Sequence, residues 1–324
     1  MSRLDEIKKP VENELKEFEP FFRDAVKSKI SLLDVVTKYI IKRKGKQMRP
    51  MFVFLSAKML GEVNQSSYRA AALIELMHTA TLIHDDVVDD SHMRRGVFSI
   101  NALWKNKIAV LVGDFLLSKG MLIALENKEY ELLEIVSKAV REMSEGELMQ
   151  IEKARKLDIK EDVYFEIIRK KTAVLIASCM ATGGKSAGLD NEQVNKLWQV
   201  GELAGIAFQI KDDLFDYQKT NLTGKPTGND IKERKLTLPL IYALNKSSKS
   251  EQKHILSLLK KKKKTDKIIS EITNFAKQKG GLEYTEKTML EYKEKSLQLL
   301  DEFSDNEAKT SLKELINYSV TRKK

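Results

Sequence analysis

The chain has 324 residues, 42% of them hydrophobic, and its 57 Lys and Arg against 47 Asp and Glu give a net charge of +10. The lysines are spread along the chain without interleaved aromatic residues or a known binding motif, which argues against a nucleic-acid partner. The N-terminal residues lack the apolar stretch of a signal peptide. No apolar run approaches the roughly 20 residues of a membrane span. Only 15 glycines and 5 prolines occur, about half of average usage, so we expect an all-α protein. Cys179 is the only cysteine, which rules out an internal disulfide and fits the reducing cytoplasm.

Patterns typical of helices follow one another along nearly the whole chain. They predict helices over residues 11–27, 32–42, 49–60, 67–90, 107–125, 132–149, 162–182, 191–217, 236–244, 249–261, 264–279, 284–303 and 305–318. Gly61 is the expected C-terminal cap of the third. No repeat and no Pro- or Ser-rich linker divides the sequence. We therefore predict a single all-α domain over residues 1–324, with the active cavity at its centre.

The helices expected at residues 67–90 and 191–217 are apolar around most of their circumference, which indicates central, buried positions. Each ends in an Asp-Asp-x-x-Asp motif. The first motif is Asp85-Asp86-Val87-Val88-Asp89 and the second is Asp212-Asp213-Leu214-Phe215-Asp216. We expect both motifs to lie at the same end of the bundle.

The spacing within each motif places two carboxylates on one face of the helix. Residues four apart share a face, so Asp85 pairs with Asp89 and Asp212 pairs with Asp216. Hard oxygen ligands of this kind suit Mg²⁺, which binds through a few carboxylates together with water and substrate phosphates. Two such pairs facing each other across a cavity would clamp a diphosphate through metal ions. A calcium-sensor site is excluded, because neither motif has the 12-residue loop with a central Gly and a terminal Glu.

A site for diphosphates also needs cations, and basic residues occur in four short clusters. These are Lys46 with Arg49, Arg94 with Arg95, Lys171 beside Thr172, and Lys225 with Lys235. Arg offers phosphate oxygens a planar fork and Lys a point charge. We expect the polar segment 218–235 to be a mobile loop over the site and residues 92–96 to be a second flap. The run Lys260–Lys264 is interpreted as a solvated helix end or loop, with transient contact with anionic lipid as the alternative.

These motifs resemble those of the trans-isoprenyl diphosphate synthases, or polyprenyl synthetases, and most of all the long-chain members that make hexaprenyl to octaprenyl diphosphate. The resemblance covers about residues 44–242. It includes Gly-Lys-x-x-Arg-Pro at 45–50, residues 78–89, Arg94-Arg95-Gly96, Lys171-Thr172, Phe208-Gln209 before the second motif, Gly224-Lys225 and residues 235–239. It implies an isoprenoid-synthase-type helical bundle, a homodimer, and Mg²⁺-dependent head-to-tail (1'-4) trans condensation of isopentenyl diphosphate with an allylic diphosphate.

The resemblance also implies roles for individual residues. About three Mg²⁺ ions would bridge the allylic diphosphate to Asp85, Asp86, Asp89, Asp212, Asp213 and Asp216. The same diphosphate would be neutralised by Arg94, Lys171, Lys225 and Lys235. Isopentenyl diphosphate would be held by Lys46, Arg49, His78 and Arg95. Thr172 and Gln209 would stabilise the allylic cation through their oxygen dipoles, and the departing diphosphate would accept the proton.

Two features need comment against the family pattern. The usual Gly-Gly-Lys-Arg-x-Arg-Pro reads Lys44-Gly45-Lys46-Gln47-Met48-Arg49-Pro50 here, so one Gly and one Arg are lost. This change predicts altered affinity for isopentenyl diphosphate rather than loss of activity. His84 and His92 flank the first motif, but Mg²⁺ prefers oxygen ligands, so we interpret both as structural residues or as supports of the ligands.

In this family the growing tail runs along the helix of the first motif, so side chains on that helix set the product length. Ala80 and Thr81, one turn before Asp85, are both small, whereas short-chain members carry an aromatic residue there. Met77 lies one turn further along. The facing wall is expected to include Phe115, Leu116 and Met121. A helical turn of about 5.4 Å is comparable to one isoprene unit, so we predict a product of about six to eight units for a respiratory quinone side chain.

Three alternatives remain. A short-chain synthase that makes farnesyl or geranylgeranyl diphosphate would keep every motif. A non-catalytic partner subunit of a prenyl synthase would usually lose one aspartate motif or the basic clusters, which are all kept here. A terpene cyclase of the same fold needs no second diphosphate, which would leave Lys46, Arg49 and Arg95 unexplained, and its second metal motif usually carries Asn, Ser or Thr.

Overall fold

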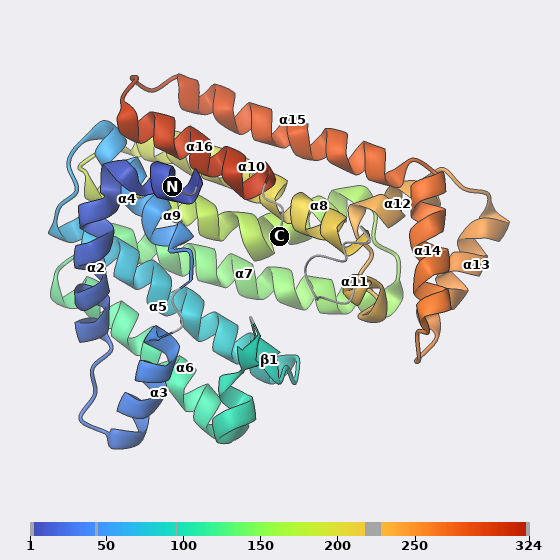
Figure 1. The fold of residues 1–324 in the computed structure, drawn as a ribbon, viewed down its shortest axis with the longest axis horizontal. Helices are drawn as coiled ribbons and strands as arrows, with labels where there is room; N and C mark the ends of the chain where they lie inside the picture. The colour runs from blue at the N-terminus through green and yellow to red at the C-terminus, as the bar shows by residue number, and fades with distance from the viewer. Residues whose placement is uncertain (1–2, 43–44, 95, 218–227, 322–324) are drawn as a thin grey trace. The chain divides into compact units, whose positions relative to one another are not determined.

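A computed structural model describes residues 3–42, 45–94, 96–217 and 228–321. Within these residues nearly every element is a helix (Figure 1), so the all-α prediction is confirmed. The chain forms two compact units. Unit 1 takes its residues from 1–140, 178–198 and 303–315, and unit 2 from 141–177, 199–302 and 316–324. That the two units form one domain around a central cavity stays a prediction.

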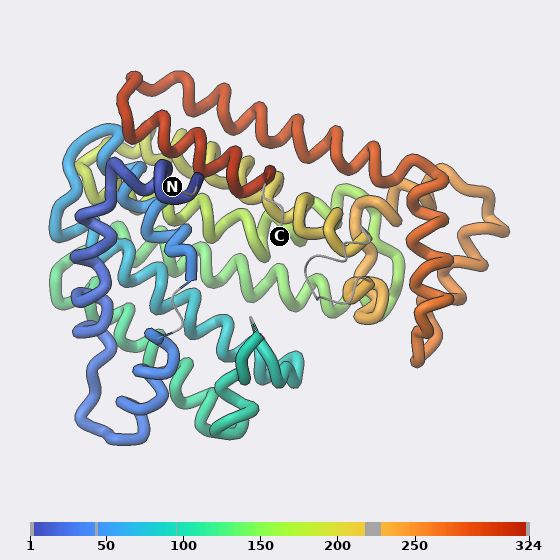
Figure 2. Tube along the Cα trace, in the orientation of Figure 1, coloured from blue at the N-terminus to red at the C-terminus, as the bar shows by residue number. Residues whose placement is uncertain are grey.

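Unit 1 is built around the pair of helices α5 and α6, which lie side by side in Figures 1 and 2. Its elements are α1 (Arg3–Lys8), the short helix η1 (Lys9–Val11), α2 (Glu12–Ala25), α3 (Ser31–Ile41), α4 (Met48–Leu60), α5 (Gln65–Val88), the strands β1 (Met93–Arg94) and β2 (Val97–Phe98), and α6 (Ile100–Glu126). Four further helices contribute residues to both units. They are α7 (Tyr130–Lys156), α9 (Val174–Ser186), α10 (Asn191–Tyr217) and α16 (Glu307–Thr321).

Helix α5 begins at a capping box. Asn64 Oδ1 accepts hydrogen bonds from the backbone N–H groups of Ser66 and Ser67, and the backbone N–H of Asn64 donates to Ser67 Oγ. This exchange satisfies donors that a helix start would otherwise leave unpaired. Most of the helix beyond it is buried, as its apolar circumference predicts, and it ends at the first aspartate motif.

Two glycines allow α6 to approach α5 closely. A Cβ on Gly113 would lie 2.1 Å from Nε2 of His84, and one on Gly120 would lie 3.2 Å from Cδ1 of Leu73. His84 Nε2 also lies 3.3 Å from the backbone oxygen of Val110. His84 is therefore a contact between the two helices, directly before the first aspartate, which supports its interpretation as a structural residue.

Unit 2 packs its helices around buried aliphatic side chains, including Ile210, Leu238 and Ile272. Besides the shared helices it contains α8 (Glu161–Ile168), the π-helical turn η2 (Arg169–Ala173), α11 (Asn229–Lys232), α12 (Leu238–Asn245), α13 (Lys249–Lys260), α14 (Asp266–Gln278) and α15 (Gly281–Asp301). Helix α12 packs against α8, α14 and α15. The basic run Lys260–Lys264 lies at the end of α13 and in the turn that follows, as expected.

The helix predicted over residues 162–182 is confirmed, but it contains a π-helical turn that was not predicted. The π-helical turn η2 separates α8 from α9, which continues to Ser186. A Cβ on Gly205 would lie 2.5 Å from Cα of Ala173, and one on Gly146 would lie 2.8 Å from Cβ of Lys170. Helices α7 and α10 therefore contact the two ends of this turn closely at Gly146 and Gly205, which have no side chains. π-Turns are frequent at functional sites, and this one carries Lys171 and Thr172.

The expectation that no apolar run approaches a membrane span also needs correction. Among the described residues, α6 is long and apolar enough to cross a membrane by length and composition alone. The helix nevertheless packs along α5 through Val112 and Leu116, which are buried. Buried helices of globular proteins pass the same test, so this is weak evidence for a membrane span.

Lys105 interrupts α6 with φ 70° and ψ 161°, a conformation that side-chain-bearing residues rarely adopt. Such strain costs about 1–3 kcal/mol, whereas a glycine costs about 0.5–1 kcal/mol in chain entropy. We therefore expect Lys105→Gly to raise the free energy of unfolding by about 1 kcal/mol, measured by denaturant titration. Lys107→Gly, in the helical part, is the matched control and should lower it by about 1 kcal/mol. Equal destabilisation by both variants would contradict the assignment of strain.

Candidate functional site

The first aspartate motif forms the last turn of α5. Asp85 is half-buried, Asp86 is 4% exposed and Asp89 is exposed at the C-cap. The backbone N–H of Asp89 donates to the backbone oxygen of Asp85 at 2.8 Å, so the helical turn is closed between them. Asp85 and Asp89 therefore share a face, as the sequence predicts.

Asp86 is engaged by the hairpin that follows. Arg94 Nε and Nη2 each lie 2.8 Å from Oδ1 of Asp86. Arg94 belongs to β1, which pairs antiparallel with β2, so Met93 and Arg94 of the proposed flap are held by Phe98 and Val97. Arg95 lies outside the described residues. In this structure Arg94 thus pairs with a motif carboxylate and keeps further N–H donors, since a guanidinium has five.

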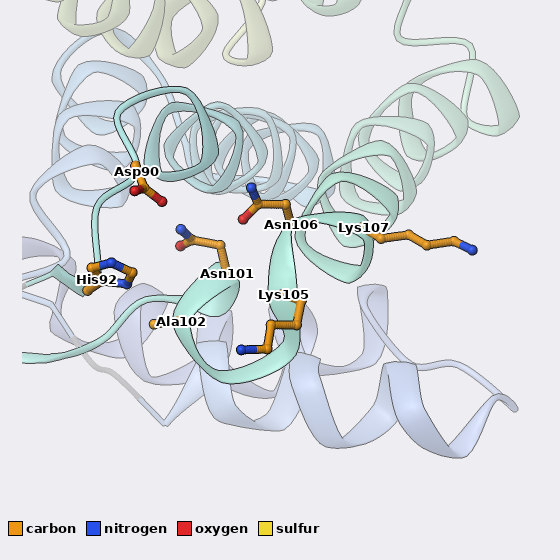
Figure 3. Close-up of a pocket in the computed structure, with 7 residues that line it drawn as sticks. All are labelled: Asp90, His92, Asn101, Ala102, Lys105, Asn106 and Lys107. Atoms are coloured by element: carbon orange, nitrogen blue, oxygen red, sulfur yellow. The ribbon is translucent and has the colours of Figure 1, made fainter.

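A pocket lies directly beyond the first motif (Figure 3). It is lined by Asp90, His92, Asn101, Ala102, Lys105, Asn106 and Lys107. Lys107 extends away from the other six side chains in Figure 3. Asn101 Nδ2 donates to the backbone oxygen of Asp86 at 3.2 Å, while its Oδ1 is buried without a hydrogen-bond partner among the described residues. The pocket wall thus supports the backbone of the motif, and His92 belongs to this wall.

The cations assigned to isopentenyl diphosphate come from α4 and α5 in unit 1. Arg49 Nε and Nη2 donate to the two carboxylate oxygens of Glu75 at 2.8 and 3.0 Å. Lys46 is exposed just before α4, and His78 is half-buried in α5. Glu75 therefore fixes Arg49 on the face of α5, and Arg49 keeps further N–H donors, since a guanidinium has five.

The second aspartate motif ends α10 in unit 2. Asp216 accepts three backbone N–H groups, with Oδ1 bound to Gly228 and Asn229 at 3.1 and 3.0 Å and Oδ2 bound to Asp230 at 3.0 Å. Asp212 is half-buried. Asp216 thus anchors the start of α11. Most of the predicted mobile loop, residues 218–227 with Lys225, lies outside the described residues.

Asp213 lies in a buried hydrogen-bonded network. Tyr164 Oη donates to Oδ2 of Asp213 at 2.7 Å, and Gln209 Nε2 donates to Oδ1 at 2.8 Å. Thr172 Oγ1 in turn donates to Oε1 of Gln209 at 2.7 Å. Burial, and then the negative charge of Asp230, raise the pKa of Asp213. Burial, and then the charge of Asp216, raise the pKa of Asp230 as well.

Of the three lysines assigned to the allylic diphosphate, the two that the structure describes are paired within unit 2. Lys171 forms an ion pair with Glu147, and its Nζ lies 3.1 Å from Oε1 of Gln150. Lys235 Nζ lies 2.5 Å from Oε2 of Glu233. Each lysine is therefore positioned by a carboxylate and keeps donors for an incoming phosphate, because an ammonium group has three.

The two motifs use their aspartates in the same way. The middle residue, Asp86 or Asp213, is buried and hydrogen-bonded to the protein, whereas the other four are half-buried or exposed. Among the described side chains no three Asp, Glu, His or Cys residues already converge as a metal site. The oxygen donors still fit Mg²⁺, because this ion usually takes one or two carboxylates and completes its shell with water and phosphate oxygens.

Sequence reasoning missed three residues at this site. They are Tyr164, Asp230 and Glu147. Tyr164 reaches Asp213 across 49 residues of sequence, and no spacing rule would have indicated this contact. Asp230 carried a weak signal, since it follows the dipeptide Gly228-Asn229 after the second motif. Glu147 resembles any exposed helical glutamate until the π-helical turn brings Lys171 to it.

The chain-length residues occupy two different faces of α5. Thr81 is half-buried and lies four residues before Asp85, so it shares the face of that carboxylate. Met77 is 5% exposed. Ala80 is fully buried in an apolar cluster with Val112 and Leu116 of α6. Met121, expected in the facing wall, is 41% exposed on α6, and its place in that wall stays a prediction.

Comparisons with known proteins agree along the whole chain. A family model described as polyprenyl synthetase matches residues 30–276. Octaprenyl diphosphate synthase of Escherichia coli is 33% identical over 300 residues, which are 92% of this chain and 93% of that protein. A polyprenyl synthase from Caulobacter crescentus, solved with calcium and isoprenyl diphosphate, has a TM-score of 0.90 and 32% identity over 98% of both chains. A geranylgeranyl pyrophosphate synthase from Bacteroides thetaiotaomicron has a TM-score of 0.85 and 38% identity over 99% of this chain and 100% of the other.

Proposed function

We propose, because this chain belongs to the polyprenyl synthetase family, that it condenses isopentenyl diphosphate with an allylic diphosphate to make a long-chain polyprenyl diphosphate. The chain is a prenyltransferase of isoprenoid biosynthesis with the all-α fold of that family. The observation that carries the proposal is the pair of complete aspartate motifs, each with positioned cations in its own unit. The family resemblance to octaprenyl diphosphate synthase supports a long product.

The cations of this site are held by carboxylates before substrate arrives. Glu75 positions Arg49, and Glu147 positions Lys171. Such pairs hold the side chains in place but leave N–H donors that a diphosphate oxygen accepts. Arg49, Lys46, His78 and Arg95 would hold isopentenyl diphosphate, and Arg94, Lys171, Lys225 and Lys235 the allylic diphosphate.

The reaction requires that the diphosphate of the allylic substrate leave easily and that the allylic cation be stabilised without being trapped by a nucleophile. The allylic carbon–oxygen bond breaks, the double bond of isopentenyl diphosphate attacks the allylic carbon, and the departing diphosphate takes the proton. Arg94, Lys171 and Lys235 would stabilise charge that develops on the departing oxygens. Thr172 and Gln209 would stabilise the cation through oxygen dipoles without trapping it.

The aspartates would hold the divalent metal that this family uses for diphosphate binding. Bound Mg²⁺, about three ions per site in our proposal, would supply further neutralisation of charge on the leaving diphosphate. Asp85, Asp89 and Asp212 offer carboxylates at the ends of their helices. Asp86, Asp213 and Asp216 also hold neighbouring groups of the protein in place.

A short-chain synthase is the second candidate. The geranylgeranyl pyrophosphate synthase from Bacteroides thetaiotaomicron is 38% identical to this chain, against 33% for the octaprenyl enzyme. Both candidates predict the same reaction. They differ in product length, which depends on the room along α5 beyond Thr81.

We further propose a homodimer formed through α6. Beyond the interruption at Lys105, five apolar residues of this helix are 40–55% exposed: Val110, Leu111, Met121, Leu122 and Leu125. At 100° per residue they fall within one face about 120° wide. Exposed Asp114 and Ser118 lie on the same face between the two groups of apolar residues. An exposed face rich in apolar residues typically marks a protein interface, and a second copy of α6 offers the same surface.

Leu122→Lys is expected to weaken the dimer at least tenfold, since a charge replaces an apolar group at the proposed interface. Light scattering behind size-exclusion chromatography would detect the monomer. The control is Leu290→Lys, because Leu290 is 44% exposed on α15 and should not affect the dimer. A wild-type monomer, or an unchanged dimer in the Leu122 variant, would contradict this interface.

We place the protein in the cytoplasm, in transient contact with anionic lipid when it releases its product. The lone Cys179 is buried and fits a reducing compartment. Lys260–Lys263 are exposed at the end of α13, and cations of this kind are attracted to anionic membrane surfaces. A long polyprenyl chain must finally enter a membrane.

The proposed reaction is tested by incubating the purified chain with isopentenyl diphosphate, an allylic diphosphate and Mg²⁺. We expect release of diphosphate only when all three are present, and loss of turnover when EDTA removes the metal. Turnover of the allylic diphosphate alone would favour a terpene cyclase. No turnover with any primer would favour the partner-subunit alternative.

A further inference from the structure

A chain of hydrogen bonds links a buried tyrosine to the π-helical turn. Tyr164 donates to Asp213, Gln209 donates to the other oxygen of Asp213, and Thr172 donates to Gln209. The four residues come from α8, the turn η2 and α10, and all four lie in the described part of unit 2. Only Tyr164 has no role in the mechanism stated above.

The direction of each bond is fixed by the chemistry of its groups. Tyr164 Oη and Gln209 Nε2 each donate to one oxygen of Asp213, which accepts both bonds. Gln209 must then turn its oxygen toward Thr172. The Thr172 hydroxyl proton is thereby committed to Gln209, and its oxygen presents lone pairs in other directions.

Because Tyr164 and Asp213 are buried, water cannot easily replace either partner of the hydrogen bond between them. Tyr164 is 3% exposed and Asp213 is 5% exposed. Water therefore has little access to replace a lost donor at Oδ2 of Asp213. An unpaired buried carboxylate oxygen carries a large penalty, so removal of the tyrosine hydroxyl favours movement of Asp213 or rotation of the Gln209 amide.

We propose that Tyr164 is a positioning residue which, through Asp213 and Gln209, holds the Thr172 oxygen in the orientation that stabilises the allylic cation. This inference rests on the proposed function, because it assigns Thr172 to that cation. Tyr164, which lies outside both aspartate motifs, would then influence the reaction by positioning Thr172. The π-helical turn contributes by placing Thr172 within reach of Gln209 of α10.

The first test is Tyr164→Phe, which removes the hydroxyl and keeps the ring. We expect kcat to fall about 10- to 100-fold, since bonds to charged groups contribute about 1.5–3 kcal/mol. The KM for isopentenyl diphosphate should stay within about twofold, because Lys46 and Arg49 belong to unit 1. Both parameters are measured on protein shown to be folded by thermal unfolding.

The matched control is Tyr284→Phe. Tyr284 also donates to a carboxylate within unit 2, to Oε1 of Glu161 at 2.5 Å, and has no role in the proposed reaction. We expect kcat within about twofold of wild type for this variant, and a smaller loss of stability because Tyr284 is half-buried. An equal, small effect of both variants on kcat would overturn the inference and assign Tyr164 a purely structural role.

A double-mutant cycle with Thr172→Val distinguishes an effect of Tyr164 through Thr172 from a nonspecific disturbance of the site. If Tyr164 acts through Thr172, adding Tyr164→Phe to Thr172→Val should lower kcat by no more than about twofold further, since the oriented group is already absent. Multiplicative losses would overturn the inference. An inactive wild-type protein would instead refute the proposed function, so the two failures are distinguishable.

Discussion

Asp85→Asn and Asp212→Asn are each expected to lower kcat/KM by at least about 100- to 1,000-fold, the loss typical of removing one group that stabilises transition-state charge. Each variant removes one carboxylate from the pair that its motif offers to Mg²⁺. Neutral Asn keeps the shape of the side chain, so the loss reflects charge and coordination. Steady-state turnover over a range of Mg²⁺ concentrations is the measurement, and excess metal should restore only part of the rate.

The fold should survive these changes. Asp85 and Asp212 are half-buried at the ends of α5 and α10, whereas Asp86 and Asp213 are the buried members of their motifs. We therefore expect thermal unfolding close to that of wild type. Asp24→Asn, in an exposed pair with Lys27, is the control for loss of one carboxylate. Wild-type rates in both motif variants would refute the metal-clamp mechanism.

Thr81→Phe is expected to shorten the product from about six to eight isoprene units to about three or four. Thr81 shares a face with Asp85 one turn away, about 5.4 Å along the helix. An aromatic ring at this position would therefore block a tail that grows along α5 from the first motif. Mass spectrometry of the products gives the chain length directly. Thr310→Phe, at an exposed position of α16, is the control for added bulk.

Ala80→Phe provides the comparison that locates the tunnel. Ala80 is fully buried against α6, so a larger side chain there should overpack the interface and cost about 1–3 kcal/mol of stability. We expect Thr81→Phe to shorten the product at a smaller cost in stability. An unchanged product distribution in the Thr81 variant would show that the tail does not follow this face of α5.

Local patterns in the sequence predicted most of the helices. The predicted helix 191–217 coincides with α10, and the predicted start at residue 107 follows the interruption at Lys105. Aspartates four residues apart on a helix must share a face, so the pairs of carboxylates were predictable as well. The helix positions and the carboxylate pairs could both be predicted because they depend only on residues close to one another in the sequence.

What the sequence could not predict depends on distant contacts. The π-helical turn at Arg169–Ala173 lies where Gly146 and Gly205 allow other helices to approach, and no periodicity reveals that. Tyr164, Glu147 and Glu75, which bind Asp213, Lys171 and Arg49, come from other helices for the same reason. Sequence analysis therefore identified the charged groups but not the residues that position them.

The most direct test of the central claim is the mass of the product made by the wild-type chain. The purified protein is incubated with Mg²⁺, isopentenyl diphosphate and, separately, allylic primers of five, ten, fifteen and twenty carbons. We predict a ladder of products that ends at about thirty to forty carbons, in line with one helical turn of open space for each unit. Products that stop at fifteen or twenty carbons with every primer would contradict the long-chain assignment while preserving the reaction, and no product at all would contradict both.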